Sequence, residues 1–527
     1  MLTITDIRGI MMGCLLLASG GSLRADDFYV NPAGDNAANG SLAAPWRTIS
    51  HALAAVPAGR RQAIHLSAGT FVEDRLLTVP SGVSLMGAGK ATSTIQVKQF
   101  FSLTEAVPNA NPHVNTFPGK FVIQLGGMDQ TISGFKLDGQ DKRCHGGLLA
   151  ERSDRLLIED LQVENFRFCG IWVIDADNTE IRDCYLKNNT YGNPAAAGKG
   201  GGDSGSLMYH RGKKLLVHDN TIIEEGNVKP DKGGYPIKGQ NRGYGGDPKP
   251  LEDARFYNNV LQAPQHGAWE NGMAPAITLE ALTVTMKNVE IHNNWINNHV
   301  SLPAATQGRG VRIHHNYFNL GRVRYAYGIE NALNDVEIDH NYFYGGIYPL
   351  ANWNKDANYR NHNIHHNIFH GACAGWMKGR ELLKYAGNVD NLRFINNTVI
   401  DDEGVGRIFA LGRYGKAEIC NNLFYRPSGA GDNWGAVNGT ITHNAFHNLT
   451  PHGTPSIAGD PLITLETNKP FQAAFYTIGP GSPLVDAGSI MPPWTDGFAG
   501  IAPDIGALEK GGAPFVVGVP GKPVTKK

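Results

Sequence analysis

Three stretches of the chain decide its fold: Ile313-His-His-Asn316-Tyr-Phe318, Ile338-Asp-His-Asn341-Tyr-Phe343 and Ile364-His-His-Asn367-Ile-Phe369. Each places a β-branched residue three positions before an Asn and an apolar residue two positions after it. The same phrase surrounds Asn220, Asn294, Asn397 and Asn422, with weaker copies at Ile158, Ile181, Phe256 and Ile441. Copies that recur about every 22 to 39 residues indicate a solenoid, in which each coil adds one strand to each sheet.

The recurring Asn is expected at a turn with positive φ, because Asn tolerates that conformation and β-branched residues do not. Stacked Asn side chains would also hydrogen-bond from coil to coil. A stripe of histidines precedes the Asn: His218, His292, His314, His315, His340, His365, His366 and His443. We expect these imidazoles to stack beside the Asn ladder, with metal binding as the alternative.

Composition excludes several classes of partner. The 527 residues carry a formal net charge of -1 and no basic run, so no nucleic-acid partner is expected. Residues 1–25 read as a signal peptide, with Arg8 before an apolar run that is too short to span a bilayer and Ala25 as a small residue for cleavage. No later segment is apolar enough for a membrane span. We therefore expect a secreted or periplasmic protein, and a monomer.

The cysteines leave two interpretations open. A mature chain would keep Cys144, Cys169, Cys184, Cys373 and Cys420, an odd number. Cys144 and Cys169 fall on neighbouring coils, where a disulfide is geometrically feasible. The alternative is that they are small buried residues in the stack.

The domain organisation follows from where the repeat starts and stops. Residues 26–80 read as an N-terminal cap with a strand at 28–30, a helix within 44–56 and a strand at 63–66. Residues 81–510 are the solenoid. Insertions are expected at 101–118, 187–206 and 226–252, and residues 511–527 are expected to be a disordered tail.

Three phrases carry a resemblance to a known group of proteins. They are "YVNPAGDNAANGSLAAPWRTISHAL" at 29–53, "GSPLVDAG" at 481–488 and "PDIGALE" at 503–509. With the repeat between them, the chain resembles secreted bacterial right-handed parallel β-helix proteins of the pectate-lyase-like superfamily. The resemblance implies an all-β fold, a right-handed parallel β-helix solenoid with an N-terminal strand–helix–strand cap. One fold hosts many reactions, so the reaction has to be argued from the site.

Aligning the coils on the ladder Asn predicts a column of outward side chains. Its middle reads Lys238, Glu280, Ala305, Glu330, Ala351 and Lys378, whereas the terminal coils place Ala150, Val173, Tyr209 and Leu411 there. Arg211, Arg380 and Arg413 flank the column, with Trp269, Tyr327, Trp353 and Trp376 nearby. Charges beside aromatic residues suit a carbohydrate cleft. We therefore expect a polysaccharide substrate, which Tyr209, Arg211 and the four aromatic residues would bind.

The leading interpretation is cleavage of an acidic polysaccharide by β-elimination. This reaction needs a base beside the uronate carboxylate and a cation for the developing enediolate. Lys378 as base and Arg413 or Arg380 as stabiliser resemble the Lys/Arg pair of alginate and chondroitin lyases of this fold, in the phrase "MKGRE…NNTVID…ALGRYG". The chain departs from that pattern: Gly379 replaces a Ser, Tyr414 replaces a His, and the carboxylates expected before the Lys are missing. Calcium, if used, would be held by Glu280, Glu330 or Asp203.

Two alternatives stay open. Glu280 and Glu330 are expected two coils apart, roughly 9.6 Å at Cα by strand spacing, which suits the acid and base of an inverting glycoside hydrolase. Lys238 would then keep Glu280 ionised. The other alternative is a non-catalytic carbohydrate-binding or surface β-helix protein. Confinement of the charges to the middle coils favours an enzyme over a scaffold.

Overall fold

The computed structural model describes most of the chain. The described residues are 26–57, 59, 61–97, 121–140, 146–190, 205–225, 234–240, 250–263, 275–280, 286–302, 308–321, 327–356, 358–371, 381–401, 407–414, 416–429, 431, 434–435, 437–465, 476–513 and 515–519. The expected signal peptide, the expected insertion at 101–118 and most of the insertions at 187–206 and 226–252 lie outside these residues. Within the described ranges, no helical segment has the length and hydrophobicity that a membrane crossing requires.

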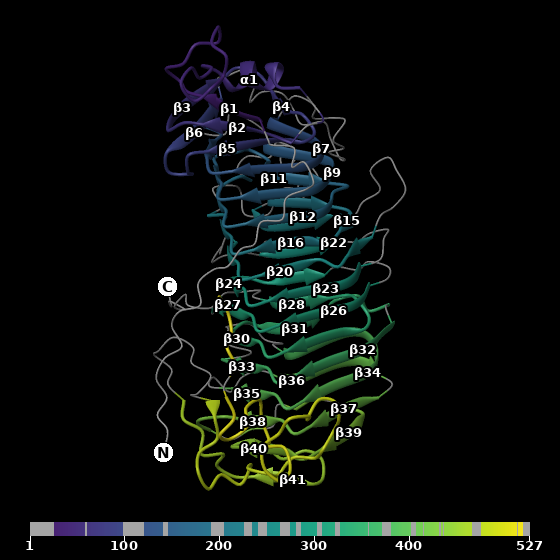
Figure 1. Ribbon diagram of the computed structural model, residues 1–527. Coiled ribbons are helices and arrows are strands. Elements are labelled where there is room, and N and C mark those ends of the chain that lie inside the picture. Colours follow the sequence, from purple (N-terminus) through teal and green to yellow (C-terminus); the bar gives the residue numbers. More distant parts are fainter. Residues whose placement is uncertain are drawn as a thin grey trace, which may run out of the picture.

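The chain winds into a right-handed parallel β-helix, as predicted, and its coils stack from the cap to the C-terminal region (Figure 1). A complete coil contributes one strand to each of three faces. The first face contains β4 (Leu77–Val79), β7 (Phe121–Ser133), β9 (Gly146–Glu159), β11 (Cys169–Ile174), β14 (Gly205–His210), β18 (Tyr235–Gln240), β22 (Ile277–Glu280), β25 (Val300–Leu302), β28 (Tyr327–Asn331), β31 (Tyr348–Asn352), β34 (Glu381–Ile395) and β36 (Arg407–Tyr414). Strands β7, β9 and β34 are long enough to continue into the second face.

The second face joins the first in one sheet, and the third face is a separate sheet. The second face adds β1 (Asp26–Val30), β2 (Gln62–Leu66), β5 (Val83–Gly87), β12 (Asp177–Arg182), β15 (Gly212–Lys213), β16 (Leu215–His218), β19 (Leu251–Glu252), β20 (Arg255–Tyr257), β23 (Met286–His292), β26 (Gly308–His314), β29 (Val336–Asp339), β32 (Asn358–His365), β37 (Ala417–Cys420) and β39 (Gly439–Thr442). The third face contains β3 (Gly69–Glu73), β6 (Ser93–Val97), β8 (Lys136–Asp138), β10 (Gln162–Glu164), β13 (Tyr185–Lys187), β17 (Thr221–Ile223), β21 (Val260–Gln262), β24 (Trp295–Ile296), β27 (Tyr317–Gly321), β30 (Tyr342–Gly345), β33 (Ile368–His370), β35 (Thr398–Ile400), β38 (Leu423–Tyr425), β40 (Asn444–His447) and β41 (Ser456–Ala458).

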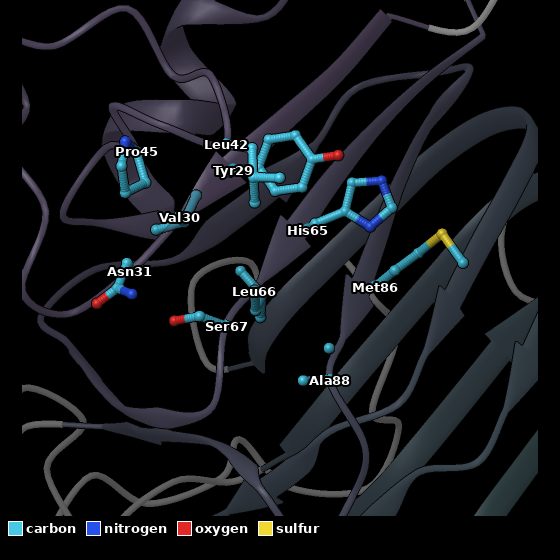
Figure 2. Close-up of a pocket in the computed structure, with 11 residues that line it drawn as sticks. Tyr29, Val30, Asn31, Leu42, Pro45, His65, Leu66, Ser67, Met86 and Ala88 are labelled. Atoms are coloured by element: carbon cyan, nitrogen blue, oxygen red, sulfur yellow. The ribbon is translucent and has the colours of Figure 1, made fainter.

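The N-terminal cap has the predicted strand–helix–strand order. Between β1 and β2 lies α1 (Ile49–Ala55), whose first turn is closed by the Thr48 side chain accepting from the backbone N–H of His51 at 3.2 Å. Figure 2 shows a pocket of about 280 Å³ in this cap, lined by Tyr29 and His65 among others. The Tyr29 and His65 rings stack at 5.1 Å. This pocket belongs to the first coils and shares no residue with the site described below.

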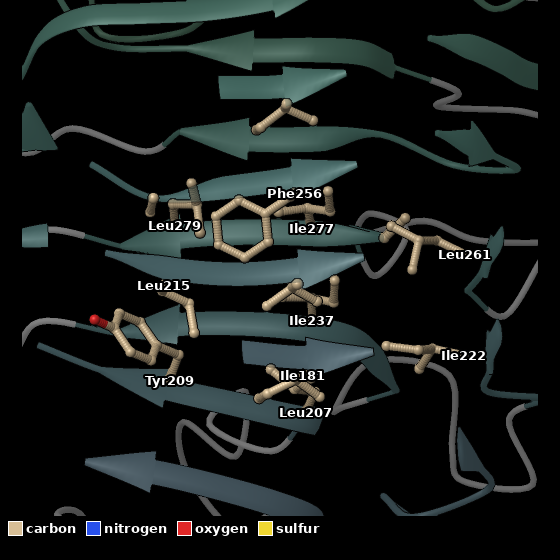
Figure 3. Close-up of a cluster of buried hydrophobic side chains, with 14 of the residues drawn as sticks. Ile181, Leu207, Tyr209, Leu215, Ile222, Ile237, Phe256, Leu261, Ile277 and Leu279 are labelled. Atoms are coloured by element: carbon tan, nitrogen blue, oxygen red, sulfur yellow. The ribbon is translucent and has the colours of Figure 1, made fainter. Parts of the chain in front are cut away.

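The core is a continuous stack of aliphatic and aromatic side chains from successive coils. Figure 3 shows part of it, where Leu207, Ile237 and Ile277 follow one another on adjacent strands of the first face. Each is fully buried. Because every coil repeats the same inward positions, the apolar residues of neighbouring coils pack in register, which explains why a chain of this length needs no division into domains.

The ladder asparagines hydrogen-bond from coil to coil, as predicted. The ladder comprises Asn220, Asn259, Asn294, Asn316, Asn341, Asn367, Asn397, Asn422 and Asn444. Each Nδ2 before the last donates to the Oδ1 of the next Asn, at 3.0 Å from Asn341 to Asn367. Each amide also donates to a backbone carbonyl of the preceding coil, so the ladder satisfies backbone groups inside the turn.

The prediction that the ladder Asn itself adopts a positive φ is wrong by one residue. The residue immediately before the Asn adopts it, with φ 54° at His315, 51° at His340 and 52° at His366. The ladder Asn turns its side chain into the coil instead. The expected stacking of the histidines is confirmed, with ring centroids 5.0 Å apart for His315–His340 and for His340–His366.

The C-terminal segment packs against the outside of the third face. Val517 is buried in a cluster with Tyr317 and Tyr342, and the backbone N–H of Gly518 donates to the carbonyl of His315 at 2.9 Å. The Phe515 ring meets the His340 ring edge-on at 5.1 Å. The prediction of a disordered tail from residue 511 is therefore wrong for residues 515–519, whose apolar side chains cover aromatic residues that would otherwise face water. The described cysteines, Cys169, Cys184 and Cys420, are buried free thiols.

We expect the protein to lose stability steeply as the pH falls below about 6.5. Burial lowers the pKa of His299 to about 3 and that of His362 to about 4. In the unfolded chain each of these rings takes up a proton near pH 6.5, but in the folded protein it cannot. Each ring therefore lowers the free energy of unfolding by about 1.4 kcal/mol per pH unit, from pH 6.5 down to its folded pKa. Burial also lowers the pKa values of His314, His315 and His366. Urea unfolding at a series of pH values measures the slope.

His362→Gln provides the control for this slope. The Nε2 of His362 donates to the carbonyl of Leu333 and its Nδ1 accepts from the Tyr385 hydroxyl, both at 2.7 Å, so the ring is neutral. Below pH 6.5, the free energy of unfolding of the variant should fall less steeply with pH, by the contribution of one proton, about 1.4 kcal/mol per pH unit. Burial raises the pKa of Glu224 to about 7, which acts in the opposite direction between pH 4.5 and 7. An unchanged slope in the variant would show that His362 does not titrate on unfolding.

Candidate functional site

One line of outward side chains runs along the first face, here called the outer column. Backbone pairing places opposite one another, on successive strands, Lys238, Thr278, Ser301, Glu330, Ala351 and Lys384. Their neighbours on each strand, such as Ile329 beside Glu330, point into the core. The column therefore lies on the outside of the helix, and adjacent members are roughly 4.8 Å apart at Cα.

A second line of side chains runs parallel to the outer column, three residues earlier on each strand. Tyr327 pairs with Tyr348, and Glu381 pairs with Arg407 on the following strands. Tyr235 occupies the same position before Lys238, and the Lys238 ammonium lies 4.7 Å from the centre of its ring. In β18, β28 and β31 an aromatic ring thus lies three residues before the member of the outer column, and in β28 these two groups are Tyr327 and Glu330.

Glu330 is the acid at the centre of the outer column. The Ser301 hydroxyl on the preceding coil donates to its Oε2 at 2.8 Å. Burial raises the pKa of Glu330, and the hydrogen bond from Ser301 lowers it by less. The result is a carboxyl that keeps its proton to a higher pH than an exposed Glu and whose side chain is half-buried, so it is partly open to solvent.

Three aromatic rings gather beside Glu330. The Trp353 ring lies 5.5 Å from that of Tyr327 and 5.1 Å from that of Tyr348. Trp353 follows directly after β31, and its ring contacts the ring of Tyr348 at the start of that strand, so it reaches back past Ala351, which is 3% exposed. Trp353 itself is 39% exposed. The three rings form a cluster, here called the aromatic platform, in which the Trp353 ring is tilted by 58° to Tyr327 and meets Tyr348 edge-on.

A cation follows the platform on the next coil. Lys384 lies opposite Ala351, and its ammonium is 3.6 Å from Glu381 Oε1, with 29% of the Lys384 side chain exposed and 4% of that of Glu381. Burial raises the pKa of Glu381, and the charges of Lys384 and Arg407 lower it by less. Along the outer column the order is therefore acid, aromatic platform and cation, on three consecutive coils.

The structure brings together some of the residues predicted from the sequence and moves others. Glu330 and Ala351 are in the predicted register, and the rings of Tyr327 and Trp353 lie 5.5 Å apart. Lys238 is in the outer column but is only 1% exposed, so its ammonium does not face solvent.

The predicted positions of Tyr209 and Arg211 are wrong. Met208, and not Tyr209, pairs with Lys238, and the Tyr209 ring lies in the core at 1% exposure (Figure 3). Its strand, "GSLMYH", is apolar on both sides, so alternation could not tell the two faces apart. Arg211 is buried and ion-paired with Asp175 at 2.6 Å, so it does not face solvent beside the outer column as predicted.

The predicted register of Glu280 is wrong by two residues. Thr278 occupies its place in the outer column, and Glu280 pairs with Gln240. A slip of two residues keeps the same face of the strand, so the pattern Ile277-Thr-Leu-Glu280 could not reveal it. The expected direct alignment of Glu280 with Glu330 therefore does not exist.

Several predicted site residues lie outside the described part of the chain. These are Asp203, Trp269, Ala305, Trp376, Lys378 and Arg380, together with the side chains of Glu280 and Arg413. The backbone of Arg413 belongs to β36, opposite Asn388 of β34.

Two groups of described side chains have the spacing of metal ligands. Two groups hold ligand atoms within 4.8 Å of one another, His315 with Asp339 and His340, and Glu337 with Asp339 and His365. Both share Asp339, which already accepts two hydrogen bonds from Arg312 at 2.7 and 2.8 Å. The guanidinium holds the pKa of Asp339 below its usual range and occupies the place of a metal cation. Glu330, the described member of the expected calcium set, belongs to no such group among the described residues.

Sequence reasoning missed Ser301, Tyr348 and Lys384. Ser301 and Lys384 sit in short apolar strands, "HVSL" and "ELLKY", whose alternation marks them as outward. Tyr348 lies two residues before the core residue Leu350, so alternation could not have found it. Pairing these strands by their apolar residues, rather than by distance from the ladder Asn, would have aligned them. The connecting segments differ in length from coil to coil, which made that distance unreliable.

Comparisons with known proteins support the fold. A family model described as a right-handed beta helix region matches residues 122–320. A search of curated protein sequences finds no match. Among solved structures, a family 28 exopolygalacturonase of Yersinia enterocolitica is 12% identical with a TM-score of 0.45, over 76% of this chain and 79% of that one.

Two further solved structures are similar. A pectate lyase is 15% identical with a TM-score of 0.37, over 92% of this chain and 96% of that one. The ORF18 protein of Geobacillus virus E2 is 12% identical with a TM-score of 0.41, over 69% of this chain and 59% of that one. The chain thus spans less than two thirds of the viral protein. Likeness at these identities concerns the fold and says nothing about the reaction.

Proposed function

We propose that the protein is a secreted enzyme that cleaves a polysaccharide bound along the first face, with Glu330 as the acid that protonates the leaving sugar oxygen. The observation that carries the proposal is the half-buried carboxyl of Glu330, held by Ser301 with its pKa raised, next to the exposed ring of Trp353. A general acid must keep its proton near the working pH, and desolvation does that for a Glu. Such a group favours an enzyme over a protein that only binds carbohydrate.

Elimination on a uronate polymer is the first candidate reaction. A base removes the proton beside the uronate carboxylate, its electrons form a carbon–carbon double bond, and the glycosidic C–O bond breaks. Glu330 gives its proton to the departing oxygen. Lys378 remains the candidate base, with Arg380 or Arg413 as the stabilising cation. The half-buried ammonium of Lys384 on the outer column favours a substrate that carries negative charge.

Hydrolysis is the second candidate reaction. Glu330 would again protonate the leaving oxygen, and Glu280 would activate a water molecule. Glu280 lies on β22, two residues beyond the outer column. That offset adds to the two-coil separation from Glu330 and is compatible with the wide carboxyl spacing of inverting enzymes.

Incubation with pectate, alginate and chondroitin tests the function and separates the two reactions. We expect the ultraviolet absorbance of an unsaturated uronate to rise with at least one polymer, because only elimination creates that double bond. New reducing ends without the absorbance would assign hydrolysis. If neither signal appears with these polymers or with their neutral, carboxyl-reduced forms, the proposal of a polysaccharide-cleaving enzyme fails.

A further inference from the structure

Lys384 has the geometry of a binding group rather than that of a structural ion pair. Glu381 is its one ion-pair partner among the described residues, and the separation of 3.6 Å is too long for a good hydrogen bond. The three N–H donors of the ammonium therefore have room for another acceptor. The side chain of Glu381 is almost fully buried beneath a Lys384 side chain that is 29% exposed, so the carboxylate fixes the cation from below.

The carboxylate of Glu381 interacts electrostatically with both Lys384 and Arg407. Arg407 pairs with Glu381 across the next strand and is exposed, so one buried carboxylate lies beside two cations. An anion approaching from solvent meets the cations first, because the carboxylate is the buried partner. This end of the outer column attracts negative groups, whereas the Glu330 end offers an acid.

The order of groups along the outer column determines where a bound anion would lie relative to Glu330 and Trp353. Ala351 separates Glu330 from Lys384, so their Cα atoms are two strand spacings apart, roughly 10 Å. The Trp353 ring lies over the intervening coil. A sugar stacked on Trp353 therefore has Glu330 on one side and Lys384 on the other, and the ammonium contacts the unit beyond the platform.

We infer that Lys384, positioned by buried Glu381, is a specificity-determining residue that binds the negatively charged group of a sugar unit next to the one stacked on Trp353. The inference rests on the proposed function, since it concerns the same bound polymer. The group bound is a carboxylate or a sulfate ester, which present the same charge-assisted hydrogen bond to an ammonium. Lys384 acts on substrate choice and does not take part in proton transfer.

Binding to a cleavage-deficient protein tests this inference. Glu330→Gln is the background, and Lys384→Gln is added to it. Titration calorimetry with polygalacturonate, alginate and carrageenan should show an affinity about 10- to 100-fold lower for the double variant with at least one acidic polymer. Affinity for carboxyl-reduced polygalacturonate should not change. A loss with carrageenan alone assigns sulfate, and a loss with the uronates assigns carboxylate.

Lys287→Gln is the matched control. Lys287 is 64% exposed and pairs with Glu252 at 2.9 Å on the second face, so it loses the same charge away from the outer column. Equal losses in the two Lys variants, an equal loss on the reduced polymer, or no saturable binding to any acidic polymer would each overturn the inference. If Glu330→Gln cleaves the polymer at the wild-type rate, the assignment of Glu330 as the acid fails instead, whatever Lys384 does.

Discussion

Glu330→Gln is expected to lower kcat by about 10²- to 10⁴-fold, with little change in the thermal unfolding midpoint. Gln preserves the size of the side chain and can still accept a hydrogen bond from Ser301, whose hydroxyl lies 2.8 Å from the carboxyl. It has no acidic proton to give to the leaving oxygen. Rates with the polymer that the wild-type protein cleaves, measured beside circular dichroism of both proteins, test the prediction.

Ser301→Ala is the companion variant, because it keeps the acid and removes its donor. The hydrogen bond from Ser301 lowers the pKa of Glu330, so its loss raises that pKa further. The acid then stays protonated at higher pH, and the basic limb of the pH–rate profile should move upward while kcat at its optimum changes less than in Glu330→Gln. Retention of full activity in Glu330→Gln would remove Glu330 from the mechanism.

The fold was predictable because one turn is repeated with the same chemistry. The ladder Asn is recognisable in the sequence since it makes the same set of bonds in every coil, as Asn341 does to Asn367 and to the carbonyl of Ile313. Few other side chains can both donate and accept in that place. The position of the positive φ was not predictable from the same phrase, because both the Asn and the residue before it, often His or Asn, tolerate it.

The site was only partly predictable because strand register depends on the connecting segments. Met377-Lys378 and Leu383-Lys384 both read as an apolar residue followed by a Lys, and only backbone pairing shows that Leu383 lies opposite Leu350. Glu330 was placed correctly because its coil is short and no long insertion separates β28 from the ladder residue Asn341. The sequence could place a charged, aromatic surface on the middle coils, but it could not assign each charge to its coil.

Burial was the other property that sequence patterns missed. Lys238 is outward in the outer column, yet its side chain is almost fully buried over the ring of Tyr235. Alternation along a strand reports which face a residue lies on, and it does not report what covers that face. The accessible part of the column is therefore narrower than predicted and centres on Glu330, Trp353 and Lys384.

Asn341→Ala is expected to destabilise the protein by roughly 3 to 5 kcal/mol, because it leaves several buried groups without partners at about 1 to 3 kcal/mol each. The Asn341 amide donates to the carbonyl of Ile313 at 2.8 Å and to Asn367 at 3.0 Å. Its oxygen accepts from both the backbone N–H and the side chain of Asn316 at 3.0 Å. Asn341 is fully buried, so water cannot replace these bonds.

Asn391→Gly is the control that distinguishes the loss of a ladder Asn from the loss of an Asn elsewhere in the chain. Asn391 is exposed, donates one hydrogen bond to Asn361 at 3.0 Å and has φ 55°, which Gly adopts without strain. Its loss should cost less than about 1 kcal/mol. Urea unfolding followed by circular dichroism compares the two variants with the wild-type chain. The ladder stabilises each coil through the next, so Asn341→Ala should also broaden the transition as the coils on its two sides unfold less cooperatively. Similar midpoints for the two variants would mean that backbone pairing of the strands, and not the ladder, holds the coils together.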